Sequence, residues 1–108
     1  MYPQDLERLA GEVPGVHPGR VVAFGVFDED AGTEAVVVVA EADTEDDSER
    51  QRIADEIRQA VTRGSDVALR QAHIVGPQWL LKTSSGKIAR LANREKYLGE
   101  MEGDLLSE

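Results

Sequence analysis

The sequence contains no cysteine, and aromatic residues make up only 5% of its 108 residues. Without cysteine there is no disulfide framework, no thiolate nucleophile and no zinc site built on cysteine ligands. The two histidines, His17 and His73, are too few and too widely separated to form a metal cluster, so we expect no metal site. The longest apolar run, at 35–40, is a fraction of the roughly 20 residues that a membrane-spanning helix needs, so we expect no membrane partner.

Positive charge is also scarce. The chain has 12 Lys and Arg against 21 Asp and Glu, a formal net charge of −9. This excess of acid argues against a nucleic-acid partner, which requires a broad basic face. The start of the sequence lacks the basic and apolar regions of a secretory signal, and a cytoplasmic location is therefore the default expectation.

Basic residues are nevertheless concentrated in one segment. Between 78 and 98 there are five bases and one acid, Glu95, so this segment should form a local cationic patch; the bases are Lys82, Lys87, Arg90, Arg94 and Lys96. By contrast, the acidic stretch at 41–56 is most simply interpreted as a solvated loop followed by a helix start, where acidic residues also suit the helix dipole.

What is present indicates one small globular domain. Hydrophobic residues make up 41% of the chain and charged residues 31%, a balance too apolar for a disordered tail. Proline and apolar spacing predict a helix at 3–12. Two runs rich in β-branched residues, at 21–27 and 34–42, predict a hairpin. The second contains four consecutive valines without alternation, which is typical of a central strand covered on both faces.

The second half of the chain predicts the remaining elements. Ser48 and Gln51 have the spacing of a capping box, and the apolar positions that follow predict a helix that stops at Gly64. A third strand is expected at 66–75, then a loop to Gly86 and a helix ending near Gly99. The fold class is therefore α+β, a small three-stranded sheet with about three helices packed on it.

The loop before the last helix carries the most distinctive chemistry. Glycine lets a backbone approach a ligand, a helix N-terminus favours anions, and a lysine supplies a mobile positive charge; all three meet at Gly86 and Lys87. A P-loop is excluded, because the positions that it requires as glycine and as serine or threonine hold Leu81 and Ile88. The segment is thus suited to an anion but is not a nucleotide-binding P-loop.

The nine residues Lys-Thr-Ser-Ser-Gly-Lys-Ile-Ala-Arg at 82–90 resemble the last core motif of the adenylate-forming ligases. Tyr-Pro-Gln-Asp-Leu-Glu at 2–7 resembles the segment that follows the hinge between their large and small domains, and 20–27 and 93–98 fit as well, so the resemblance covers nearly the whole chain. The residues of these two motifs are most similar to those of the fatty-acyl-AMP ligase and acyl-CoA synthetase branch. The resemblance implies a C-terminal mobile domain at 1–98, followed by an acidic tail at 99–108 that we expect to fray.

The resemblance also implies an activity for the complete enzyme. ATP and a fatty acid would give an acyl-adenylate and pyrophosphate, and the acyl group would pass to the phosphopantetheine thiol of coenzyme A or an acyl carrier protein. Lys87 would be the catalytic residue. The substrate- and cofactor-binding residues would be Lys82, Thr83, Ser84, Ser85, Gly86 and Arg90.

The motifs by which the family's large N-terminal adenylation domain holds ATP and Mg are absent from this sequence. We therefore expect the domain to swivel against such a partner, and the isolated chain to be inactive.

Plainer interpretations remain open beside this one. Lys87 would ordinarily be a solvated lysine at a helix start, and Lys82 and Arg90 common surface cations. The chain could instead be a non-catalytic α+β module that binds an anion or regulates a partner, and a third, weaker hypothesis makes 82–96 a nucleic-acid contact. Trp79 is interpreted as a packing residue, with a contact to the large domain as the functional alternative.

Overall fold

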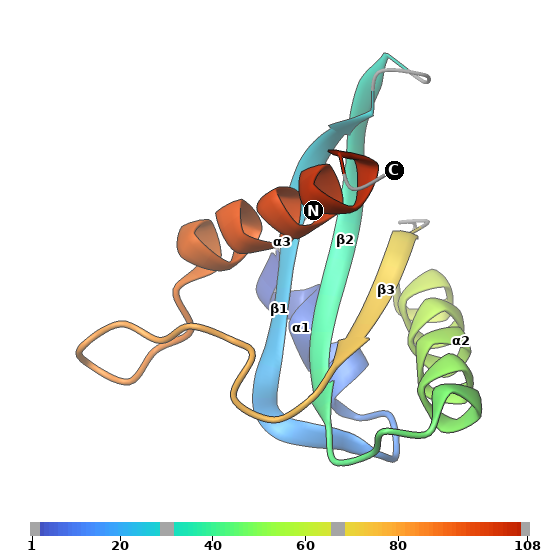
Figure 1. Cartoon of the computed structure of the whole chain (residues 1–108). Coiled ribbons are helices and arrows are strands. Elements are labelled where there is room, and N and C mark those ends of the chain that lie inside the picture. The colour runs from blue at the N-terminus through green and yellow to red at the C-terminus, as the bar shows by residue number, and fades with distance from the viewer. Residues whose placement is uncertain (1–2, 29–31, 66–68, 107–108) are drawn as a thin grey trace.

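The structure, a computed structural model, describes residues 3–28, 32–65 and 69–106. A three-stranded sheet has the order β1-β2-β3, with β1 (Val16–Asp28), β2 (Thr33–Ala42) and β3 (Leu69–Val75). Helix α1 (Pro3–Gly11) precedes the sheet, α2 (Asp47–Gly64) joins β2 to β3, and α3 (Arg90–Leu106) comes last (Figure 1). The predicted α+β class is confirmed.

The sheet is mixed. β1 and β2 form the expected antiparallel hairpin, and β3 lies parallel to β2, which places β2 at the centre. A parallel neighbour needs a crossover connection, and α2 supplies it. Of the expected third strand at 66–75, residues 66–68 lie outside the described part of the chain.

The run of valines in β2 serves two cores. Val36 and Val38 pack with residues of α1 and α2 on one face, whereas Val37 and Val39 pack with α3 and the loop before it on the other. Figure 1 shows the same layers, with α1 behind the strands and α3 in front of them. Because alternate side chains of a strand point to opposite faces, a strand covered on both sides must be apolar throughout. The predicted central strand is thus confirmed.

The buried face and the end of helix α2 agree with the prediction, but its start does not. Ile53, Ile57 and Val61 are buried on one face, and the helix ends at Gly64 as expected. The predicted capping box is wrong, because Asp46 is the N-cap and its carboxylate accepts the Ser48 N–H at 2.9 Å. An aspartate two residues earlier provides an acceptor for one of the free N–H groups of the first turn, the Ser48 N–H, and adds negative charge at the helix N-terminus.

Helix α3 begins at Arg90 and continues through Gly99 to Leu106, so the predicted end near Gly99 is wrong. Outside the helix's own backbone, no atom of the described residues lies within 4 Å of the place where a Cβ would sit on Gly99. A glycine inside a helix costs only about 1 kcal/mol, which the surrounding turns can offset. Among the helices of the described segments, none is long and apolar enough to cross a membrane.

Candidate functional site

Residues 82–88 form a tight hairpin that projects from the body of the domain. Lys82 and Ile88 make an isolated antiparallel bridge, the Thr83 N–H donates to the Lys87 carbonyl at 2.7 Å, and the Gly86 N–H donates to the Thr83 carbonyl at 2.9 Å. Gly86 has φ of 84°, the left-handed conformation that closes such short loops and that glycine adopts without steric cost. In Figure 1 the hairpin is the orange loop that extends away from the sheet between β3 and α3.

The hydroxyl groups of this loop shape the turn. The Thr83 and Ser85 hydroxyls are hydrogen-bonded at 2.9 Å, and the Lys87 N–H donates to the Thr83 Oγ1 at 3.3 Å. Ser84 is exposed at the tip. Two of the three hydroxyls predicted to bind a ligand therefore have partners within the loop itself.

Lys87 is exposed, and its ammonium group has no hydrogen bond or ion pair within the described residues. The same holds for Lys82 across the hairpin. Lys87 lies at the edge of an open hollow of about 660 Å³ whose other walls come from α1 and the start of β1. The side chain is thus not packed beneath the fold, and a companion surface can reach it.

The loop is held at its base by a carboxylate that the sequence did not single out. Glu41 is only 1% exposed and lies at the end of β2, where it accepts the Leu80 N–H at 2.8 Å and the Arg20 Nε–H at 2.9 Å. Burial acts to raise the pKa of Glu41, but hydrogen bonds from the Leu80 backbone, Arg20 and the Gln78 backbone together leave the pKa below its ordinary value. The expectation that the whole acidic stretch at 41–56 is solvated is therefore wrong at its first residue.

A buried amide provides the second attachment. Asn93 on α3 is fully buried; its Oδ1 accepts the Leu81 N–H at 2.7 Å, and its Nδ2 donates to the carbonyls of Leu81 and Ala89 at 3.0 Å each. One side chain thus joins the entry of the hairpin to its exit. Glu41 and Asn93 leave 82–88 to project from a fixed base.

The cationic patch divides into engaged and unengaged groups. Arg90 donates two hydrogen bonds to the Glu7 carboxylate, at 2.9 and 3.0 Å, and one to the Ala23 carbonyl at 3.1 Å. Arg94 donates to the Gly25 carbonyl at 2.9 Å, and Lys96 donates to the Trp79 carbonyl at 2.6 Å. Lys82 and Lys87 are therefore the two bases of the patch whose charge is left to an outside partner.

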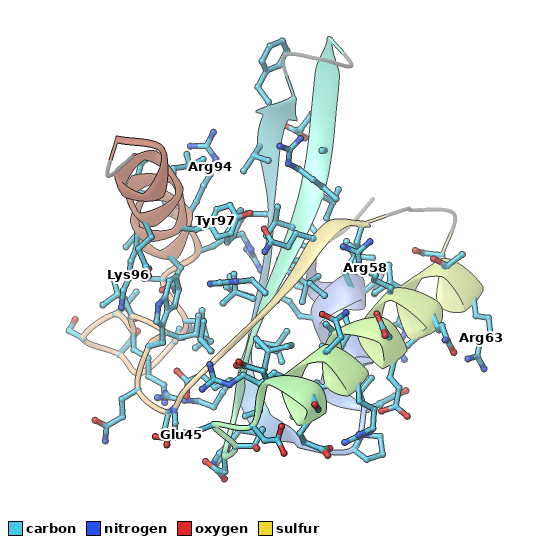
Figure 2. The ribbon with its side chains drawn as sticks, turned by 45° about the vertical axis from the view of Figure 1, so that its right-hand side comes forward. Glu45, Arg58, Arg63, Arg94, Lys96 and Tyr97 are labelled. Atoms are coloured by element: carbon cyan, nitrogen blue, oxygen red, sulfur yellow. The ribbon has the colours of Figure 1, made fainter. Side chains whose placement is uncertain are left out.

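Aromatic and histidine side chains take part in packing. Trp79 packs against the core between the sheet and α3, and the Lys96 ammonium lies 4.3 Å from the Trp79 ring centroid. The His73 ring makes edge contacts with the rings of Trp79 and Tyr97. Tyr97 lies between α3 and the sheet (Figure 2). His17 is 3.5 Å from an Asp43 carboxylate oxygen. Within the segments that the structure describes, no group of three or more histidine or acidic residues could hold a metal ion.

Comparison with known proteins places this arrangement in a class. No family model matches the chain. In structure it resembles part of a keto acid-selecting non-ribosomal peptide synthetase module containing an adenylation domain, with a TM-score of 0.84 and 22% identity over 98% of this chain and 9% of that one. It also resembles a fatty acyl-adenylate ligase from Legionella pneumophila in complex with acyl adenylate and pyrophosphate, with a TM-score of 0.72 and 25% identity over 90% of this chain and 17% of that one.

Sequence relatives are more specific. The chain is 40% identical over 93 residues to the protein Rv1013 of Mycobacterium tuberculosis, covering 83% of this chain and 16% of the relative. It is 36% identical over 117 residues to the long-chain-fatty-acid–AMP ligase FadD32 of Mycobacterium marinum, covering 90% and 19%. The chain thus spans less than a fifth of the length of these relatives. Sequence and fold together show that it belongs with the adenylate-forming ligases, where it corresponds to their C-terminal domain.

Proposed function

We propose that this chain is the catalytic C-terminal subdomain of an ATP-dependent, AMP-forming fatty-acid ligase, and that Lys87 supplies the positive charge for acyl-adenylate formation. The observation that carries the proposal is the exposed Lys87 ammonium, which has no partner in the described residues and stands on a hairpin with a fixed base. A long side chain that only covered the surface would not need such an anchored support.

The chemistry follows from the charge that develops in the reaction. An oxygen of the fatty-acid carboxylate attacks the α-phosphorus of ATP, the bond from that phosphorus to the bridging oxygen breaks, and pyrophosphate leaves. Negative charge increases on the oxygens around the phosphorus. An ammonium group held beside them stabilises the transition state more than the ground state. Lysine suits this role because its charge is compact and its stem is long.

The other residues of the motif take secondary roles in this proposal. Lys82 is a second free cation for the phosphate groups, the Ser84 hydroxyl stands exposed at the tip, and Thr83, Ser85 and Gly86 shape the turn that presents Lys87. Arg90 has its strongest contacts inside the domain, so we assign it support of the hairpin in preference to direct substrate binding.

The remaining parts of the reaction belong to a large domain. We propose that an N-terminal adenylation domain binds ATP, Mg²⁺ and the acyl chain, and that the small domain swivels against it. The acyl group then passes to the thiol of coenzyme A or of a carrier-protein phosphopantetheine. The length of the relatives, more than five times the matched segment, supports such a partner.

A domain exchange tests the proposal. The segment of FadD32 that aligns with this chain is replaced by the chain, and acyl-adenylate formation is followed by ATP–pyrophosphate exchange. We expect exchange well above that of the FadD32 large domain alone, and a loss of about 10²–10³-fold on Lys87→Ala. The control is Arg63→Ala, because Arg63 lies on α2 away from the hairpin and is hydrogen-bonded only to Gln59 among the described residues (Figure 2).

Two results would contradict the proposal: a Lys87→Ala chimera that exchanges pyrophosphate as fast as the unaltered chimera, or turnover by the isolated 108-residue chain. The second result would mean that this chain holds the adenine, the metal and the fatty acid by itself. Pyrophosphate binding to the isolated chain without any activity in the chimera would favour the non-catalytic anion-binding module.

A further inference from the structure

The outer edge of β1 is covered by side chains instead of another strand. β1 pairs only with β2, so its second row of backbone groups has no strand partner. The Glu7 carboxylate accepts the Ala23 N–H at 2.8 Å, Arg90 donates to the Ala23 carbonyl, and Arg94 donates to the Gly25 carbonyl. Edge strands commonly need such protection, because their free groups otherwise pair with other chains.

Two of these three side chains are also joined to each other. Arg90 donates to both oxygens of the Glu7 carboxylate and forms an ion pair with it. The Glu7 and Arg90 side chains are 20% and 39% exposed, so water and salt screen this ion pair less than a fully exposed one. The Arg90 Nη2 donates to both Glu7 oxygens and its Nε donates to the Ala23 carbonyl, so the guanidinium is held at two nitrogens and is fixed in orientation as well as in position. The pair connects α1 to the first residue of α3.

That first residue is close to the candidate catalytic group. Arg90 follows Lys87 by three residues, and the exit strand of the hairpin runs directly into it. Glu7, Arg90, Gly86 and Lys87 all line the hollow between α1 and the hairpin. Glu41 contacts Leu80, and Asn93 contacts Leu81 and Ala89, so of these attachments the Glu7–Arg90 pair is the one that reaches α1.

We propose that Glu7 is a positioning residue for Lys87. Its carboxylate holds the Arg90 guanidinium and thereby fixes the direction in which the 82–88 hairpin leaves the domain. Glu7 also ties that direction to α1, so that the hairpin and α1 move as one body. The consequence for catalysis rests on the function proposed above, whereas the effect on hairpin order does not.

The simpler alternative is that Glu7 and Arg90 only protect the edge of β1. Arg94 provides a matched control for this alternative. Arg94 lies one turn further along α3, donates to the next outward carbonyl of β1, that of Gly25, and is 34% exposed. Among the described residues, Arg94 makes no hydrogen bond or ion pair with Glu7 or with the hairpin. Glutamine at position 7 keeps an acceptor for the Ala23 N–H, so if edge protection were the only role, Arg94→Met would loosen the hairpin at least as much as Glu7→Gln.

The first experiment measures backbone order in the 108-residue chain. We expect Glu7→Gln to lower the ¹⁵N order parameters of residues 83–88 by about 0.2, a large part of the interval between rigid backbone, about 0.85, and flexible backbone, below about 0.6. Glutamine can still accept the Ala23 N–H, so the fold should survive. Arg90→Lys is the second variant, because its single nitrogen cannot replace the separate guanidinium contacts with Glu7 and with the Ala23 carbonyl. Unchanged order in both variants, or equal loosening by Arg94→Met, would overturn the proposal.

The second experiment uses the chimera described above. We expect Glu7→Gln to lower the kcat of pyrophosphate exchange about tenfold while the KM for ATP stays within about twofold, because misplacing a reacting group by 1 Å can cost up to about 10²-fold. Arg94→Met should change kcat less than about twofold. In a Lys87→Ala background, Glu7→Gln should have almost no further effect, since residues that act as a unit are not additive.

If Glu7→Gln lowered the kcat of pyrophosphate exchange by the same factor in the unaltered and the Lys87→Ala chimera, Glu7 would act independently of Lys87. That result would refute the positioning role. If Lys87→Ala were fully active, the proposed function would fail, and the order parameters would still decide whether Glu7 positions the hairpin.

Discussion

Replacing Glu41 with glutamine should destabilise the domain far more than its place in an acidic stretch suggests. The carboxylate side chain is 2% exposed and its partner Arg20 is 20% exposed. Glutamine removes the charge that neutralises Arg20, and its NH₂ group replaces one of the two oxygens that accept from the Arg20 Nε–H and the Leu80 N–H, so one of these donors loses its acceptor. Breaking a fully buried pair costs about 3–5 kcal/mol, and the partial exposure of Arg20 lowers our expectation to about 2–3 kcal/mol.

Urea unfolding of the 108-residue chain, followed by circular dichroism, measures this cost. Glu45→Gln is the matched control, because Glu45 belongs to the same acidic stretch but is exposed, and it should change stability by less than about 0.5 kcal/mol (Figure 2). The argument fails if Glu41→Gln unfolds at the same urea concentration as Glu45→Gln.

The pH dependence provides a second check on Glu41. Its pKa is lower in the folded protein than the ordinary value of 4.5, so the unfolded chain binds the proton more readily. The stabilisation by the ionised carboxylate is therefore fully present above about pH 4.5 and is lost as the pH falls through the folded pKa. The difference in unfolding free energy between the wild type and Glu41→Gln should shrink below about pH 4. A constant difference down to pH 3 would show that the charge is not the cause.

Two further predictions concern the hairpin and its base. Gly86→Ala should destabilise the chain by about 1–2 kcal/mol, since φ of 84° is unfavourable for alanine even though the space for a Cβ is open. Gly99→Ala in α3 should stabilise the chain by about 0.5–1 kcal/mol, because alanine favours a helix more than glycine does. Thermal unfolding of both variants tests these two predictions. Asn93→Ala should cost about 1–3 kcal/mol in urea unfolding, because the Leu81 N–H loses its acceptor, while the Leu81 and Ala89 carbonyls each keep a backbone donor and lose only the Asn93 amide. Stability unchanged by Asn93→Ala would mean that water replaces the amide.

Local patterns in the sequence determined most of the elements. The four consecutive valines predicted a central strand, the apolar repeat ending at Gly64 predicted α2, and the two β-branched runs predicted the hairpin. These features depend on residues a few positions apart, which is the range over which helix and strand periodicity acts. The nine-residue motif at 82–90 also indicated Lys87 as a candidate, because its glycine, hydroxyl groups and lysine are adjacent in the chain, and the role of Lys87 stays a prediction.

Two helix boundaries differ from the predicted ones, because helix ends depend on small energy differences. Asp46 and Ser48 can both cap a helix, and the structure selects Asp46. Gly99 resembles a helix end but is tolerated inside α3 at a cost of about 1 kcal/mol. Differences of this size can be offset by neighbouring turns, so sequence pattern alone does not resolve them.

Only the tertiary structure decided which charged groups are free. Glu41 meets Leu80 across 39 positions in the sequence, and Arg90 meets Glu7 across 83. No local pattern distinguishes Glu41 from the solvated acids that follow it, or Arg90 from Lys87, because burial and pairing arise when distant segments fold together. The sequence by itself therefore determined where the charged motif lies, and the long-range contacts left Lys82 and Lys87 as the bases of the 78–98 patch without a partner among the described residues.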